Sequence, residues 1–124
     1  MGTSEIRWYI LIMVQLAGAE REIIDRYRHA LRDRFPQAIS EMILFGSRVR
    51  GEGHPDSDLD LLVVLNTQDP DLKREVLDLA WETMLSLDFK VFISPIVFFK
   101  KDYDRYRSWN SSFLENISRD AVRL

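Results

Sequence analysis

The stretch that decides the fold spans residues 44–65 and has the sequence LFGSRVRGEGHPDSDLDLLVVL. In its last part, apolar residues recur at every second position, and this period of two predicts a β-strand over residues 59–65. One face of that strand would carry four apolar residues, Leu59, Leu61, Val63 and Leu65. Asp58 and Asp60 therefore share the opposite face, at the N-terminal end of the strand.

Two chemical features meet in this stretch. Two carboxylates on neighbouring positions of one strand face can converge on one divalent cation, or on two cations about 3.5–4 Å apart. Oxygen ligands suit Mg²⁺ or Mn²⁺, so Asp58 and Asp60 are predicted metal ligands. Upstream, Gly46 and Ser47 follow a strand predicted over residues 38–45, and their N–H groups and hydroxyl suit a phosphate. Each feature alone is more typical of an ordinary strand end or turn, but together they predict a site.

These residues resemble the minimal nucleotidyltransferases of the polymerase-beta superfamily. That family has a hydrophobic residue followed by Gly-Ser, a short spacer, and then Asp-hydrophobic-Asp-hydrophobic. Here the two halves stand as FGS at residues 45–47 and DLDL at residues 58–61. The flanking GSRVRG at residues 46–51 and PDSD at residues 55–58 are also similar to the small stand-alone members of the family.

The resemblance implies a role for each matching residue. Gly46 and Ser47 would hold the triphosphate of ATP or another nucleoside triphosphate, and Asp58 and Asp60 would hold Mg²⁺ or Mn²⁺ and act as catalytic carboxylates. Arg48 would add a charge-assisted contact to phosphate. The alternative for Arg48 is a salt bridge to an acidic side chain of its own loop.

The resemblance also implies a third catalytic carboxylate near the start of a third strand. The β-branched and aromatic run at residues 89–99 predicts that strand, and Asp88 lies immediately before it. In a regular strand Asp88 would share one face with Lys90, Phe92 and Ser94. Asp88 is therefore the expected third acid, although small relatives carry the acid near the position of Phe92. If Lys90 or Phe92 is the true equivalent, the acidic triad is incomplete.

The rest of the chain predicts helices packed on a small sheet. Apolar residues recur at helical spacing over residues 19–35 and 71–86, and further helices are expected over residues 100–107 and from Ser112. The order α-β-β-α-β-α-α predicts an α/β (α+β) fold with a small mixed sheet. We expect one domain over residues 1–124, which matches the nucleotidyltransferase fold that the resemblance implies. Pro95 requires a bulge or an edge strand. Trp81 is interpreted as a core residue or a subunit contact.

Composition excludes several classes of function. The 124 residues are 46% hydrophobic and 30% charged, as in ordinary globular proteins. A net charge of −3 excludes a general basic field, so no extended nucleic-acid surface is expected. The absence of cysteine excludes disulfides, a thiolate nucleophile and a zinc-thiolate site. The apolar segment 6–16 is too short to span a bilayer, which predicts a cytoplasmic protein, and it offers a surface for a homo-oligomer.

The resemblance implies two hypotheses about function. The first is an Mg²⁺-dependent nucleotidyltransferase that moves AMP from ATP onto a hydroxyl acceptor. For small members of the family, the resemblance implies a partner protein with a HEPN domain, encoded by a nearby gene. The chain would neutralise that partner as an antitoxin neutralises its toxin. The second is a catalytically weakened nucleotide-binding module that neutralises its partner by binding alone. Asp58 and Asp60 favour the first hypothesis, and the open question of the third acid favours the second.

Overall fold

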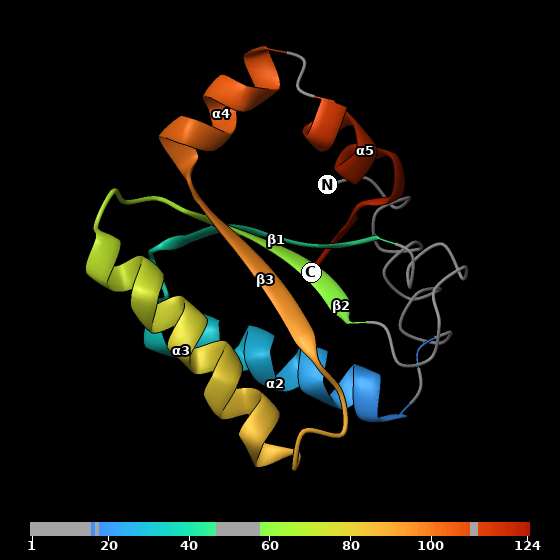
Figure 1. Ribbon diagram of the computed structural model, residues 1–124. Helices are drawn as coiled ribbons and strands as arrows, with labels where there is room; N and C mark the ends of the chain where they lie inside the picture. The colour runs from blue at the N-terminus through green and yellow to red at the C-terminus, as the bar shows by residue number, and fades with distance from the viewer. Residues whose placement is uncertain (1–15, 17, 47–57, 110–111) are drawn as a thin grey trace.

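The computed structural model describes residues 16, 18–46, 58–109 and 112–124. The helices are α2 (Gly18–Arg34), α3 (Pro70–Ser86), α4 (Lys100–Ser108) and α5 (Ser112–Asp120). The strands are β1 (Ile39–Phe45), β2 (Leu59–Leu65), β3 (Ile93–Phe99) and β4 (Val122–Arg123). They form one sheet in the order β3-β2-β1-β4, in which β3 runs parallel to β2 and β1 is antiparallel to both neighbours (Figure 1). The predicted mixed sheet with packed helices is confirmed.

Helices cover both faces of this sheet. On one face, α2 and α3 bury the four residues predicted to share a face of β2, Leu59, Leu61, Val63 and Leu65. On the other face, α4 and α5 pack against Leu62 and Val64 (Figure 1). Strand β2 is therefore central and buried on both sides beyond Asp60, which explains its nearly continuous apolar sequence.

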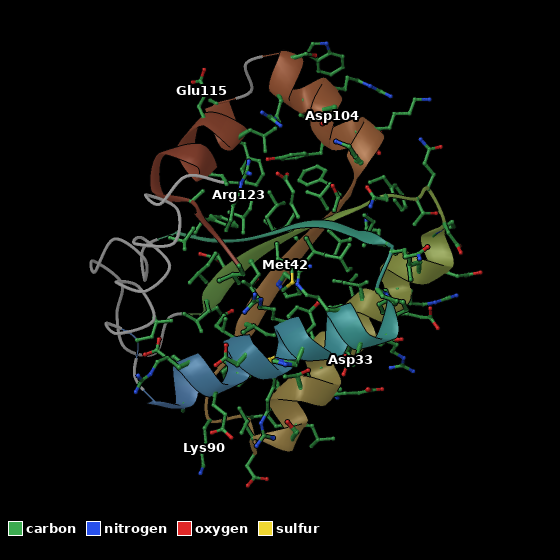
Figure 2. The ribbon with its side chains drawn as sticks, turned by 180° about the vertical axis from the view of Figure 1, so that it is seen from behind. Asp33, Met42, Lys90, Asp104, Glu115 and Arg123 are labelled. Atoms are coloured by element: carbon green, nitrogen blue, oxygen red, sulfur yellow. The ribbon has the colours of Figure 1, made fainter. Side chains whose placement is uncertain are left out.

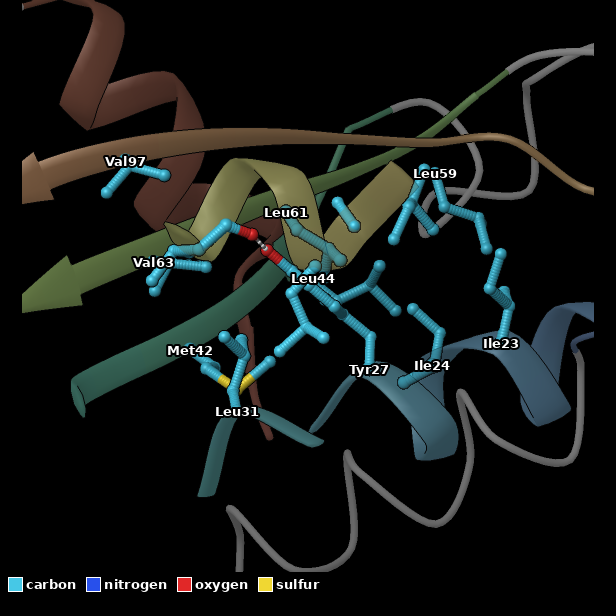
Figure 3. Packing of buried hydrophobic residues seen from close by; sticks show 14 of the residues in the cluster. Ile23, Ile24, Tyr27, Leu31, Met42, Leu44, Leu59, Leu61, Val63 and Val97 are labelled. Atoms are coloured by element: carbon cyan, nitrogen blue, oxygen red, sulfur yellow. Dashed lines mark hydrogen bonds between the residues drawn. The ribbon is translucent and has the colours of Figure 1, made fainter. Parts of the chain in front are cut away.

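One buried tyrosine forms a hydrogen bond between α2 and α3, the two helices of the first face. The Tyr27 hydroxyl donates a hydrogen bond of 2.8 Å to the carbonyl oxygen of Val76, across the interior of the cluster (Figure 3). Burial disfavours the charged phenolate, so it raises the pKa of Tyr27 above its ordinary value of 10.0. The tyrosine thus stabilises the fold through its neutral form.

Tyr27→Phe is expected to lower the free energy of unfolding by about 1 kcal/mol at neutral pH, because it removes that buried hydrogen bond. A raised pKa in the folded state means that stability is fully present below the unfolded pKa and is lost as the pH rises above it. The variant should therefore lose less stability than the native chain above about pH 10. Urea unfolding at neutral and alkaline pH measures both effects. Tyr106→Phe, which alters a partly exposed tyrosine, is the control, and equal changes in the two variants would contradict the assignment.

The predicted helix over residues 71–86 begins one residue earlier, at Pro70. Asp69 caps it, because the Asp69 side chain accepts a hydrogen bond of 2.9 Å from the backbone N–H of Asp71. The inward face carries Val76, Leu79, Ala80, Thr83 and Met84, as the helical spacing predicts. This helix is the crossover that connects the parallel strands β2 and β3.

The predicted start of the third strand is wrong. The prediction placed it at residue 89, whereas β3 begins at Ile93. Asp88 and Phe89 have φ angles of 53° and 54°, a left-handed conformation that cannot continue an extended chain. The structure confirms the prediction for Pro95, because β3 is an edge strand.

The ends of the chain add two features. Residues 122–123 form the short strand β4, which the sequence analysis did not predict, and Arg123 makes an ion pair of 3.3 Å with Glu41 of β1. Leu16 is buried in the main core, while residues 6–15 lie outside the described part of the chain, so the proposed oligomer surface stays a prediction. Among the described residues, no helix combines the length and apolarity needed to cross a membrane.

Candidate active site

The two predicted metal ligands lie where β2 begins. Asp60 is the second residue of the strand and is half-buried, and Asp58 immediately precedes the strand and is exposed. The backbone N–H of Leu59 donates a 2.9 Å hydrogen bond to the carbonyl of Phe92, so the chain is already paired at this point. Alternation along β2 places the two aspartates on the same face, the face covered further along by α4 and α5.

Gly46 lies against the carboxylate of Asp60. Phe45, the last residue of β1, is the register partner of Asp60, and Gly46 follows it with a φ of +95°. A Cβ placed on Gly46 would collide with Oδ2 of Asp60 and lie 3.2 Å from its Cγ. Both observations confirm that this position requires glycine. Among the described residues, the group that approaches Gly46 closely is the Asp60 carboxylate. The predicted metal ligand therefore lies directly beside the glycine of the predicted phosphate turn.

Gly46→Ala is expected to displace Asp60 and reduce metal-dependent ATP affinity at least about tenfold, which corresponds to about 1.4 kcal/mol. The positive φ angle adds strain of about 1–3 kcal/mol to the folded state. Calorimetry and urea unfolding measure the two effects. Gly18→Ala is the matched control, because a Cβ at Gly18 meets nothing within 4 Å. Unchanged ATP affinity in Gly46→Ala would separate this glycine from the nucleotide site.

The neighbouring strand supplies no carboxylate beside the two aspartates. The parallel register pairs Asp60 with Ser94 and Leu59 with Ile93, and continued by one residue before both strands it sets Phe92 opposite Asp58. Ser94 is half-buried, and 48% of the surface of Phe92 is exposed. The Ser94 hydroxyl, for which no sequence pattern predicts a role, is a further polar group beside Asp60. Only the register of the parallel pair identifies it as the direct neighbour of Asp60.

The structure places Asp88 in the turn that follows α3. Its side chain is exposed, and its backbone N–H donates a 3.0 Å hydrogen bond to the Leu85 carbonyl. Because the chain turns at residues 88–89, the expected common strand face of Asp88, Lys90 and Phe92 does not form. Lys90 is exposed and points away from the fold (Figure 2). Within the described ranges, no three acidic, histidine or cysteine side chains gather as a metal-binding group, so Asp88 does not join Asp58 and Asp60.

The donor set of the described site suits Mg²⁺. This ion is usually held by one or two protein carboxylates, with phosphate oxygens of the substrate and water completing its octahedral shell. Asp58 and Asp60 supply two carboxylates, and the Asp60 carboxylate occupies the space that a Cβ on Gly46 would need at the end of β1. The two remaining predicted contacts, Ser47 and Arg48, lie outside the described residues.

Comparison with known proteins agrees with this geometry. The sequence profile described as "Nucleotidyltransferase domain" matches residues 24–121, which include Gly46, Asp58 and Asp60. This chain belongs to the nucleotidyltransferase family. The resemblance identified from residues 45–61 is thereby confirmed, and the protein is a nucleotidyltransferase.

Two relatives of this nucleotidyltransferase come from Methanocaldococcus jannaschii, and both are provisionally named protein adenylyltransferases. One is 30% identical over 103 residues, covering 83% of this chain and 96% of the relative. The other is 34% identical over 102 residues, covering 82% of this chain and 94% of the relative. A crystal structure from Sulfolobus solfataricus, provisionally described as a nucleotidyltransferase, aligns at a TM-score of 0.49 and 21% identity over 85% of this chain and 82% of that one.

Proposed function

We propose that this nucleotidyltransferase transfers AMP from ATP to a side-chain hydroxyl of a second protein, with Mg²⁺ or Mn²⁺ held by Asp58 and Asp60. The observation that carries the proposal is the contact between the Asp60 carboxylate and the backbone of Gly46. It brings a proposed metal ligand beside the glycine that precedes Ser47 in the sequence. The names of the two M. jannaschii relatives support AMP as the transferred group and a protein as the acceptor.

The proposed reaction is an exchange at the α-phosphorus of ATP. The oxygen of the acceptor hydroxyl forms a bond to that phosphorus, and the bond to the bridging β-phosphate oxygen breaks. Pyrophosphate leaves with the electron pair of the broken bond, and the hydroxyl proton passes to solvent. The product is a phosphodiester between AMP and the acceptor side chain.

Each described residue has a defined part in this proposal. Asp58 and Asp60 hold the cation, which neutralises charge on the phosphates when it is bound. Gly46 leaves room for the Asp60 carboxylate because it has no Cβ. Ser94 lies beside Asp60 and can donate its hydroxyl hydrogen to a carboxylate or phosphate oxygen.

Transfer of label from ATP tests the proposal. We expect ATP labelled at the α-phosphate to label a protein when it is incubated with the chain, Mg²⁺ and a lysate of the source organism. Mass spectrometry should then place AMP on a serine, threonine or tyrosine. A HEPN-domain protein, the partner expected from the family resemblance, is the first purified acceptor to test. No labelling, or equal labelling by the native chain and Asp60→Asn, would overturn the proposal.

A second candidate function has one observation in its favour. Ser94 occupies the β3 position beside Asp60, Phe92 lies one residue before β3 with its carbonyl bonded to Leu59, and neither is a carboxylate. A site with two acids can hold a metal–nucleotide complex and still transfer slowly, and the protein would then act on its partner by binding. ATP binding without any transfer of label would favour this function over the first.

A further inference from the structure

An exposed apolar row runs along the outer face of α3. Leu77, Trp81 and Leu85 lie four residues apart, so they share one face of the helix. Their exposed fractions are 40%, 60% and 56%, which contradicts the interpretation of Trp81 as a core residue. We call these three residues the α3 stripe.

The α3 stripe continues to the edge of the candidate active site. The ring of Trp81 lies 5.0 Å from that of Phe89, and Phe89 stacks on Phe92 with ring centroids 6.0 Å apart. The carbonyl of Phe92 accepts the hydrogen bond from Leu59, the residue between the two aspartates. A molecule lying along the stripe would therefore end beside the start of β2, next to the residue that separates the two aspartates.

A row of four acidic side chains borders the α3 stripe. These residues follow helical spacing and are all exposed: Asp71, Glu75, Asp78 and Glu82. Glu82 makes an ion pair of 3.8 Å with Arg34 of α2, which places the row on the side of the stripe away from β3. Asp71 is paired with Arg74 of the same helix, whereas within the described part of the chain Glu75 and Asp78 have no ion-pair partner and leave two uncompensated negative charges.

Charge decides which partner fits this surface. In a two-fold antiparallel pairing of α3 with a second copy, the acidic row of each copy would face that of the other, and like charges repel. A helix with an apolar face bordered by lysine or arginine instead matches the stripe and the row together.

We infer that the α3 stripe and its acidic row dock a basic amphipathic helix of the acceptor protein, beside the site that modifies it. The inference rests on the proposed function, because it takes the acceptor to be a protein. It adds the surface that selects that protein and the chemistry that the surface recognises. Docking at α3 would hold the acceptor hydroxyl near Asp58 through contacts that do not involve the nucleotide.

Binding of a synthetic peptide tests the inference without any nucleotide. The probe is a fluorescein-labelled amphipathic helix of about 18 residues, or five turns, with leucines on one face and lysines on both borders. The comparison peptide carries glutamate in place of every lysine. We expect fluorescence anisotropy to give at least tenfold tighter binding of the lysine peptide. Binding of neither peptide, or equal binding of both, would overturn the inference.

Variants of the chain locate the binding surface. Trp81→Ala should weaken binding of the lysine peptide at least tenfold, and the double variant Glu75→Lys, Asp78→Lys should reverse the preference between the two peptides. Trp109→Ala is the matched control, because Trp109 is 65% exposed but lies beside Arg105 just after α4. Equal losses in Trp81→Ala and Trp109→Ala would overturn the inference. So would a dimer of the native chain in sedimentation that Trp81→Ala dissociates.

Calorimetric measurement of ATP binding distinguishes a failure of this inference from a failure of the proposed function. Trp81→Ala should bind ATP and Mg²⁺ as the native chain does, because Trp81 contributes nothing to the metal site. A native chain that binds the lysine peptide but never transfers AMP would overturn the proposed function and leave the docking surface in place. A chain that transfers AMP but binds no lysine peptide would do the reverse.

Discussion

Asp60→Asn is expected to reduce the rate of AMP transfer by at least about 100-fold, which corresponds to about 2.7 kcal/mol of transition-state stabilisation. Asn has nearly the same shape, but its amide carries no charge and is a poor ligand for Mg²⁺. The Asp60 side chain lies against Gly46 at the end of β1, and Ser94 is its neighbour on β3. Within the described residues, Asp58 is then the one remaining carboxylate of the site.

The fold should tolerate this change. Asp60 lies at the start of β2, and Asn preserves both its volume and its extended backbone. Urea unfolding should therefore give a similar free energy for the variant and the native chain. Asp33→Asn, at an exposed aspartate of α2, is the control and should leave transfer unchanged (Figure 2). Full transfer activity in Asp60→Asn would remove this residue from the metal site.

Phe92→Asp is expected to increase metal affinity in the presence of ATP at least about tenfold, or about 1.4 kcal/mol. Continued by one residue before both strands, the register of β2 and β3 sets Phe92 opposite Asp58, where a third carboxylate would join the other two. Three crowded carboxylates repel one another without a metal and are stabilised when one binds. If the third acid limits the native enzyme, the rate of transfer should also rise.

Phe92→Asn is the matched control for this gain, because it removes the same aromatic ring without adding a charge. The exposed turn residue Asp88 provides the complementary test. Asp88→Ala should leave metal affinity and transfer unchanged, because the turn after α3 keeps it out of β3. A 100-fold loss of rate in Asp88→Ala, with no gain in Phe92→Asp, would show that the third acid comes from this turn.

The central part of the fold was predictable because short-range rules decide it. Alternation along residues 59–65 fixed both faces of β2, and therefore the common side of Asp58 and Asp60. The need for glycine at residue 46 was also predictable, since a tight turn follows an apolar strand. The group that approaches Gly46 was not, because the contact depends on the pairing of β1 with β2.

The errors come from conformations and pairings that local patterns do not encode. The apolar run at residues 89–99 favours a strand throughout, but the two left-handed residues Asp88 and Phe89 delay β3 to Ile93. Non-glycine residues seldom adopt this conformation, so a sequence pattern gives no warning of it. The two-residue strand β4 is too short for any periodicity, and only its pairing with β1 defines it.

The proposed function requires that Asp58 and Asp60 bind a nucleoside triphosphate through a divalent cation beside Gly46. Calorimetric titration of ATP into the chain, first with Mg²⁺ and then with EDTA, tests it most directly. We expect binding with Mg²⁺, at least about a tenfold loss of affinity in EDTA, and a similar loss in Asp60→Asn with Mg²⁺ present. Equal ATP affinity under all three conditions would contradict it.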